Sequence, residues 1–400
     1  MNRSNTGGHT GAGGRTGGHT GGHAGGRTGA HKGVNLPALR NHNAALVLDL
    51  LRAAGETGIS RLELAERTGL TPQAVSKITG RLRDEGTATD AGRRASTGGK
   101  PRTVLKLVPS AAHAIGLHLD RDELTAVLVD LAGTLVGART VPLDLGARPS
   151  CVVETAAAEA EALTGGRRVL GVGVAMPGPL DHDSGVLHRV TGFPHWNGFP
   201  LRDALAERLG QKVVLDKDTN AAALGLALRG GVQNGSFAYL HLGSGLGAGL
   251  VLGGSLHRGA RTGAGEFGHQ TILLGGPVCG CGGRGCIEAL CLAAVARGDI
   301  AAAARFLGVG AANLVGLLDI DEILLGGRTV TADQDTFVRG VGAVVEERAR
   351  RGGAPAIPVG PAAGGPHAVA EGAAQLVLVP VFGRASVAYP QPPGPSSPSV

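Results

Sequence analysis

The stretch Cys279-Gly-Cys-Gly-Gly-Arg-Gly-Cys-Ile-Glu288 carries three of the five cysteines of the chain. His269 precedes it by ten residues. Three thiolates and one imidazole suit a tetrahedral zinc ion and leave no open coordination position. We therefore expect a structural zinc site formed by His269, Cys279, Cys281 and Cys286. The alternative is a metal-free, glycine-rich loop with three reduced thiols.

Other short motifs flank this loop in a fixed order. They are Gly171-Val-Gly-Val-Ala-Met-Pro-Gly-Pro-Leu180, Asp218-Thr-Asn-Ala-Ala222, Leu242-Gly-Ser-Gly-Leu-Gly-Ala-Gly249, Ala264-Gly-Glu-Phe-Gly-His269 and Ile323-Leu-Leu-Gly-Gly327. One glycine motif alone is weak evidence in a chain with 70 glycines, but the ordered set with its cysteines is specific. Short Val/Leu/Ile strands alternate with alanine-rich helical stretches from Ala114 onward, which predicts an α/β fold.

Together these motifs resemble the ROK family, named for repressors, open reading frames and kinases, over roughly residues 36–380. The resemblance implies an actin-like, sugar-kinase-like fold with two lobes around a cleft, at residues 110–232 and 233–385. Asp218 matches the general base of the sugar kinases, and Glu266, His269 and Glu288 match positions that hold sugar hydroxyls. Carboxylates and imidazole suit hydroxyl groups. The implied ligand is a sugar or sugar phosphate.

The first phosphate-binding motif departs from the family pattern. ROK kinases have an Asp-x-Gly-Gly-Thr loop where this chain reads His118-Leu-Asp-Arg-Asp-Glu123. Without the glycines the backbone cannot approach a phosphate closely, and the acidic side chains repel it. We therefore expect a degenerate kinase-like domain that is not an enzyme, with no catalytic residue and with Asp218 as a sugar contact only. A sugar kinase is the alternative.

Two further departures concern the sugar site and its surroundings. The family has an Asn-Leu-Pro-x-Trp run where this chain reads Gly192-Phe-Pro-His-Trp196, so the asparagine contact to the sugar is missing. Only about 35 residues separate Glu288 from Ile323, which is enough for two helices where the family has several. A constitutive DNA-binding protein with an inert sensor is therefore a second alternative.

Residues 35–109 have the pattern of a winged helix-turn-helix. Helical spacing of apolar residues predicts a helix that ends near Gly55 and a second helix before Gly69, and Thr71 and Pro72 are typical of the start of a third. This third helix presents polar and cationic side chains on its outer face, as in helices that enter the DNA major groove. The expected DNA contacts on it are Gln73, Ser76, Lys77 and Arg81.

The segment that follows predicts the wing. Residues 91–119 contain no acidic residue, and Gly98-Gly99 supplies a turn between two extended arms. A basic hairpin of this kind can lie along the phosphate backbone or in a minor groove. The expected contacts are Arg93, Arg94, Lys100 and Arg102. A charged helical hairpin that mediates protein contacts is the alternative.

Composition sets the remaining expectations. The chain has 400 residues, is 42% hydrophobic and carries a net charge of +6, which allows a polyanionic partner. We expect a cytoplasmic protein, because no apolar run reaches roughly 20 residues and the N-terminus lacks an apolar signal core. The glycine-, histidine- and threonine-rich residues 1–34 and residues 386–400 are expected to be disordered. A homo-oligomer, either a dimer or a tetramer, is expected to bind operator DNA as a sugar-responsive repressor.

Overall fold

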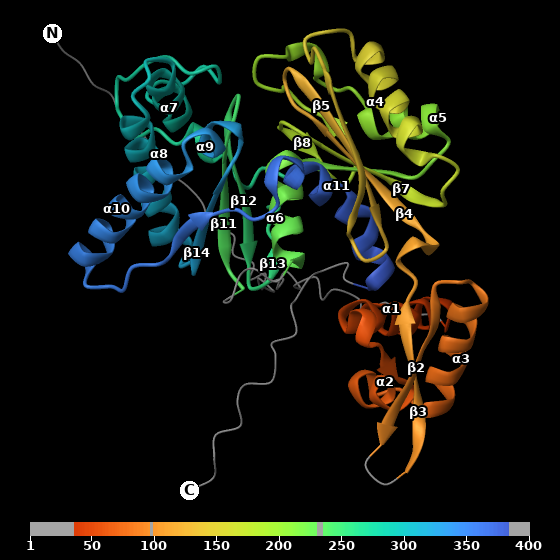
Figure 1. Cartoon of the computed structure of the whole chain (residues 1–400). Coiled ribbons are helices and arrows are strands. Elements are labelled where there is room, and N and C mark those ends of the chain that lie inside the picture. The colour runs from red at the N-terminus through yellow and green to blue at the C-terminus, as the bar shows by residue number, and fades with distance from the viewer. Residues whose placement is uncertain (1–35, 97–98, 230–234, 384–400) are drawn as a thin grey trace, which may run out of the picture.

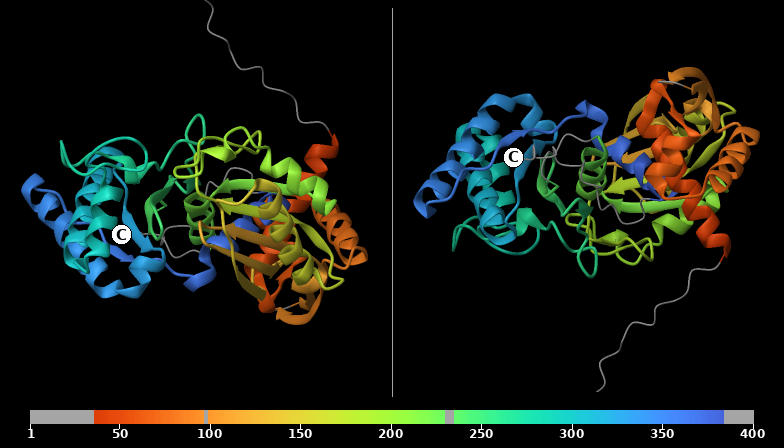
Figure 2. Two further views of the ribbon diagram at one scale, coloured as in Figure 1. Left: turned by 90° about the horizontal axis from the view of Figure 1, so that it is seen from above. Right: turned by 90° about the horizontal axis from the view of Figure 1, so that it is seen from below.

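The computed structural model describes the backbone of residues 36–96, 99–229 and 235–383, and the side chains of 41–92, 102–229 and 235–383. The tails that we expected at 1–34 and 386–400 lie outside these residues. Figure 1 shows a small helical domain with a hairpin next to two α/β lobes. Seen from below in Figure 2, the small domain covers only the half of the molecule that the first lobe forms.

The small domain is the predicted winged helix-turn-helix. Ser60 forms a capping box with Glu63 at the start of its second helix, and Gly69 ends that helix in the left-handed region with φ 68°. The side chain of Thr71 accepts a hydrogen bond from the Ala74 amide at 3.2 Å and begins the third helix. The elements are α1 (Leu36–Ala54), β1 (Ile59–Ser60), α2 (Arg61–Thr68), α3 (Pro72–Asp84) and the hairpin of β2 (Ala88–Ser96) and β3 (Gly99–Leu107).

The first lobe is a five-stranded sheet in the order β10-β7-β4-β5-β6. Its strands are β4 (His113–Leu119), β5 (Glu123–Asp130), β6 (Leu135–Pro142), β7 (Val169–Met176) and β10 (Val213–Lys217). α4 (Pro149–Thr164) and α5 (Leu201–Leu209) pack on one face, where Trp196 and leucines from both helices and strands form the core. A two-stranded ribbon of β8 (Leu180–Asp181) and β9 (Val186–Leu187) follows β7.

The second lobe repeats this topology in the order β13-β12-β11-β14-β15. Its strands are β11 (Phe237–Leu242), β12 (Leu246–Leu252), β13 (Ser255–Leu256), β14 (Glu322–Gly326) and β15 (Val359–Pro361). In both lobes an antiparallel meander is extended on one side by two parallel strands. The β4–β5 turn at 120–122 and the β11–β12 turn at 243–245 are therefore equivalent, and they lie on opposite sides of the cleft.

The number of helices between Glu288 and Ile323 agrees with the two that we expected for this short segment. Two helices, α7 (Ile287–Ala296) and α8 (Ile300–Leu318), fill the region before β14, as predicted, and α9 (Arg328–Ala332) and α10 (Gln334–Gly352) follow it. By length and composition α8 is the one described helix that could cross a membrane, but half of its apolar window is buried. Since α8 packs between α7 and α10, the fold accounts for its apolar residues.

Two helices lie between the sheets (Figure 1). They are α6 (Asp218–Leu228), which packs on β12, and α11 (Ala368–Leu378), which packs on β4 and β7 although it comes near the end of the chain. They approach so closely that a Cβ atom on Gly372 would lie 1.9 Å from the Ala221 carbonyl oxygen. A Cβ atom on Gly116 of β4 would likewise lie 1.9 Å from the Ala370 carbonyl oxygen of α11.

α11 also connects the lobes to the winged domain. It continues into a 3-10 turn, Val379–Phe382, that packs on α1, where the Arg52 guanidinium lies 4.5 Å from the Phe382 ring centroid. Leu51 and Leu105 of the winged domain belong to the same buried cluster as Val127 of the first lobe and Leu378 of α11. The winged domain and the first lobe therefore share one hydrophobic core.

We predict that Gly372→Ala destabilises the protein by about 1–3 kcal/mol, because the added methyl group must displace the α6 backbone. Gly342→Ala is the matched control: Gly342 lies inside α10, and a Cβ atom there would meet nothing within 4 Å, so alanine should stabilise by about 0.5–1 kcal/mol. The measurement is the free energy of unfolding from chemical denaturation. Equal effects of the two substitutions would contradict the close packing of α11.

Candidate functional site

The cleft between the lobes contains a cavity that all four expected sugar ligands line: Asp218, Glu266, His269 and Glu288. Its unoccupied space is about 610 Å³, including solvent at the open mouth. Asp218 begins α6 directly after the carboxyl end of β10. Glu288 lies in the first turn of α7, is 8% exposed, and accepts a hydrogen bond from the Leu246 amide at 2.9 Å.

Lys217 is a part of this site that sequence reasoning missed. It is only 3% exposed, and its Nζ donates to Glu266 Oε1 at 2.9 Å and to the Ala264 carbonyl oxygen at 2.6 Å. This buried cation holds one of the two carboxylate oxygens of Glu266 in a fixed position. The only signal in the sequence was a lysine at the end of an apolar strand, immediately before Asp218.

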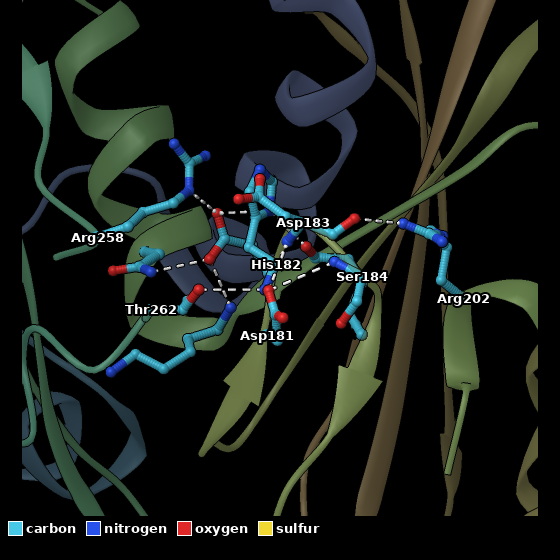
Figure 3. A network of polar contacts seen from close by, with 11 residues as sticks. Asp181, His182, Asp183, Ser184, Arg202, Arg258 and Thr262 are labelled. Carbon is cyan, nitrogen blue, oxygen red and sulfur yellow. Dashed lines mark hydrogen bonds and ion pairs between the residues drawn. The ribbon is translucent and has the colours of Figure 1, made fainter. Parts of the chain in front are cut away.

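A buried polar network fixes the loop that leads to Glu266. Asp216 is fully buried; its Oδ1 accepts from Asn220 Nδ2 at 2.8 Å, and its Oδ2 accepts from Arg258 Nε at 2.7 Å. The His182 amide donates to Thr262 Oγ1 at 3.1 Å, and Figure 3 shows His182, Arg258 and Thr262 meeting in this network. Arg258 and Thr262 belong to the second lobe, so the network joins the two lobes beneath the cavity.

Thr262 supports the view that this loop is held under constraint. Its φ of 55° lies in the left-handed region, which is unfavourable for a β-branched residue. Such conformations persist only when the surrounding contacts determine them, and they cluster at functional sites. The burial of Thr262, at 6% exposed, and its bond to His182 supply such contacts.

The β4–β5 turn, Asp120-Arg-Asp122, is hereafter the acidic turn. Its carboxylates contact the second lobe across the cleft: Asp120 Oδ1 accepts from Ser244 Oγ at 2.9 Å, and both oxygens of Asp122 lie 2.9 Å from Arg328 Nη1. Ser244 belongs to the equivalent turn, 243–245, of the second lobe. The chain's own carboxylates thus bind donors of the second lobe at the place where the sequence predicted a lost phosphate loop.

His241 lines the same cavity. Its Nδ1 is 2.8 Å from the hydroxyl of Tyr239. Burial lowers the pKa of His241, although the charge of Asp218 acts in the opposite direction. Burial therefore favours the neutral form of this imidazole, which lines the cavity together with Asp218.

The predicted metal ligands also come together. The ligand atoms of His269, Cys279, Cys281 and Cys286 all lie within 4.8 Å of one another. Cys279 Sγ is 3.7 Å from His269 Nδ1, and Cys281 Sγ is 3.8 Å from Cys286 Sγ. Around a zinc ion with Zn–S bonds of about 2.3 Å, two sulfur ligands at tetrahedral corners are about 3.8 Å apart. The donor set and its spacing therefore fit a tetrahedral metal ion.

The expected DNA contacts on α3 are exposed. These are Gln73, Ser76, Lys77 and Arg81, while Val75 and Leu82 on the opposite face are buried. Arg102 of β3 is also exposed. The backbone of the hairpin places Arg94 opposite Arg102 and Arg93 opposite Thr103. The side chains of Arg93, Arg94 and Lys100 lie outside the described residues.

Comparison with known proteins agrees with these features. A model of the ROK family matches residues 114–297, and a model of winged helix-turn-helix DNA-binding domains matches residues 46–87. A putative xylose repressor from Caldicellulosiruptor sp. (strain Rt8B.4) is 28% identical over 339 residues, which cover 73% of this chain and 84% of that protein. Alignments with three further xylose repressors cover only 59–61% of their lengths, so the chain spans less than two thirds of those proteins.

Solved structures share the fold. A ROK family transcriptional regulator described as a homologue of the E. coli MLC protein is 22% identical with a TM-score of 0.69, covering 86% of this chain and 97% of that one. The ROK hexokinase from Thermus thermophilus is 31% identical with a TM-score of 0.52, covering 66% of this chain and 96% of that one. The chain is therefore a member of the ROK family with an N-terminal winged helix-turn-helix domain.

Proposed function

We propose that this protein is a sugar-responsive transcriptional repressor that binds operator DNA through its winged domain and a sugar or sugar phosphate in the interlobe cleft. The observation that carries the proposal is the hydrophobic core shared by the winged domain, the first lobe and α11. A ligand that changes the lobe arrangement then also changes the position of α3, provided that it binds one arrangement more tightly than the other. The names of the repressor relatives support this assignment.

In the proposed sugar site, the carboxylates of Asp218, Glu266 and Glu288 accept hydrogen bonds from sugar hydroxyls, and His269 supplies an imidazole nitrogen. The carboxylates come from β10–α6, the loop after β13 and α7. Because these elements belong to both sides of the cleft, a sugar that binds all of them favours the closed arrangement. Such a sugar would bind the closed arrangement more tightly than the open one, which is what a sensor requires.

The acidic turn argues against a sugar kinase, which is the alternative function. Asp120 and Asp122 place negative charge where nucleotide phosphates would need donors, and Ser244 and Arg328 are already bonded to these carboxylates. A nucleotide would have to break both contacts and overcome the repulsion of the acids. We therefore propose a degenerate kinase-like domain in which Asp218 contacts the sugar without acting as a base.

We further propose that the His/Cys cluster holds a structural zinc ion. His269, Cys279, Cys281 and Cys286 would be its ligands, which fill a tetrahedral shell and leave no site for hydrolytic chemistry. When bound, zinc would supply a cross-link between the 3-10 turn that ends at His269 and the loop before α7. Glu266 and Glu288 flank these segments, so the metal would fix the distance between two sugar ligands.

We propose a cytoplasmic homo-oligomer, a dimer or tetramer, as the acting species. An operator with two-fold symmetry is read by two winged domains related by the same symmetry. The contacts would come from α3 and from the basic hairpin β2–β3.

The first prediction concerns DNA binding. Combined replacement of Lys77, Arg81 and Arg102 by alanine should weaken operator binding, because each lost phosphate contact lowers the slope of log K against log salt by about 0.9. Affinity should be measured by fluorescence anisotropy at several salt concentrations. Arg305→Ala, an exposed arginine of α8, is the control and should leave affinity and slope unchanged. Unchanged values in the triple variant would refute this DNA interface.

The second prediction concerns the metal. The purified protein should contain about one zinc ion per chain, and Cys281→Ser should lose the metal and lower the melting temperature, because one of four ligands is removed. Metal content by atomic emission and thermal denaturation provide the measurements. Cys151→Ser, an exposed cysteine of α4, is the control for thiol loss. Stoichiometric zinc retained by the Cys281 variant would exclude this ligand set.

The third prediction tests the sensor against the kinase. A sugar or sugar phosphate should change the operator affinity of the wild type, whereas Asp218→Asn should bind operator normally and respond poorly. A coupled assay across the same sugars should detect no ADP release. Sugar-dependent ADP release would support the kinase instead. If no sugar changes operator affinity more than about twofold, roughly 0.4 kcal/mol of coupling, the inert-sensor alternative holds.

A further inference from the structure

Arg121, at the centre of the acidic turn, is a half-buried cation that lines the cavity together with the expected sugar ligands. Its guanidinium carbon lies 5.5 Å from the Phe193 ring centroid, a cation–π arrangement that limits where the side chain can go. Among the side chains that the structure describes, none forms an ion pair or hydrogen bond with this guanidinium. An arginine held in place without an acidic partner is suited to bind a ligand.

The other charges around the cavity are bonded within the protein. Lys217 holds Glu266, and Asp122 of the acidic turn is paired with Arg328. Asp120 accepts from Ser244. Glu288 accepts from a backbone amide. In the described part of the chain, Arg121 is thus the cationic side chain of the cavity whose donors are free for a ligand.

Arg121 lies next to residue 192, where the family resemblance predicts an asparagine that contacts the sugar. Gly192 occupies the place of the asparagine expected from the family resemblance, and a Cβ atom there would lie 3.4 Å from Arg121 Nη1. A Cβ atom on Gly245, in the second lobe, would lie 3.6 Å from Arg121 Nη2 and 3.2 Å from Glu288 Oε2. The guanidinium therefore fills the space next to residue 192 and extends toward the sugar ligand Glu288.

This replacement changes which chemical group the site can accept. An asparagine amide both donates and accepts hydrogen bonds, so it pairs well with a hydroxyl. A guanidinium only donates and carries a permanent charge, and its planar fork matches two oxygens of a carboxylate or phosphate. The group that faces Arg121 should therefore be an acceptor, and an anionic one gains most.

We propose that Arg121 is a specificity-determining residue that makes the cleft select a monosaccharide bearing an oxyanion, a phosphate ester or a carboxylate, over the neutral sugar. This inference rests on the proposed sugar-sensing function and narrows its ligand class. The carboxylates of Asp120, Asp218, Glu266 and Glu288 also line this cavity and would repel such a group. We therefore expect the oxyanion to bind in direct contact with the Arg121 guanidinium, next to residue 192.

The test is a titration of the full-length protein by isothermal calorimetry. Glucose, mannose and N-acetylglucosamine are each compared with their 6-phosphates, and glucuronate is added as the carboxylate probe. We expect at least one anionic sugar to bind tenfold or more tightly than its neutral parent. The 6-phosphates and glucuronate then distinguish which oxyanion the site accepts.

Variants assign this preference to the side chain. Arg121→Gln keeps the size and a donor but removes the charge, so it should lose the preference while affinity for the neutral sugar changes less than threefold. Arg121→Lys should retain part of the preference. Arg148→Gln, an exposed arginine at the start of α4, is the matched control and should behave as the wild type.

A reciprocal variant strengthens the assignment. Arg121→Gly combined with Gly192→Asn restores an amide at residue 192, whose φ of 87° asparagine tolerates better than other side chains. This double variant should prefer the neutral sugar. Tighter binding of neutral sugars by the wild type, or an unchanged preference in Arg121→Gln, would overturn the proposal and leave sugar sensing intact. Failure of every sugar to bind would overturn both.

Discussion

The backbone contact of α11 with the elements around it is the constraint on which the rest of the structure depends. Gly372 touches α6, while Gly116 and Gly173 let the β4 and β7 strands reach the α11 backbone. Contacts this close leave no room for gradual adjustment, because packed interiors respond to strain by switching between discrete arrangements. α11 also continues into the turn that packs on α1, so this helix contacts both the lobes and the winged domain.

Two ionic contacts between the lobes differ in how deeply they are buried. At the base, the carboxylate of Asp216 is fully buried and paired with Arg258, and loss of either partner would leave a buried uncompensated charge or polar group. At the rim, the Asp122 side chain is more than half exposed and the Arg328 side chain is half exposed. Their ion pair therefore contributes little to the stability of the protein. The lobes are therefore joined by a buried charge at Asp216 and by an exposed, weak ion pair at the acidic turn.

The features that the sequence predicted correctly are those with local signals. Thr71 and Pro72 indicated the start of α3, the absence of acidic residues indicated the hairpin, and the spacing of the cysteines indicated the cluster that they form with His269. The sequence could not predict the ion pairs between residues that are far apart in the chain. Arg328 is 206 residues from Asp122, and Glu266 is 49 residues from Lys217. No short pattern encodes such pairs, because they arise only when the two lobes face each other.

The proposed role of Arg121 also depends on residues that are far apart in the sequence. The sequence shows that glycines are missing from the phosphate loop, and this suggests only a loss of function. Arg121 and Gly192 lie 71 positions apart, yet Arg121 Nη1 lies 3.4 Å from where a Cβ atom on residue 192 would be. Two departures that look like separate losses in the sequence are, in space, one exchange of a neutral contact for a cationic one.

The His/Cys cluster determines which nitrogen of His269 is free to hydrogen-bond in the cleft. His269 presents Nδ1 to Cys279, so a metal ion on this nitrogen leaves the proton of the neutral ring on Nε2. In the proposed site His269 and Arg121 would then donate hydrogen bonds to the ligand, while Asp218, Glu266 and Glu288 would accept them. A sugar hydroxyl can do both, but an oxyanion can only accept and must face the donors. In the proposed site, this arrangement of donors and acceptors would orient an anionic sugar with its charged group toward Arg121 and its hydroxyls toward the carboxylates.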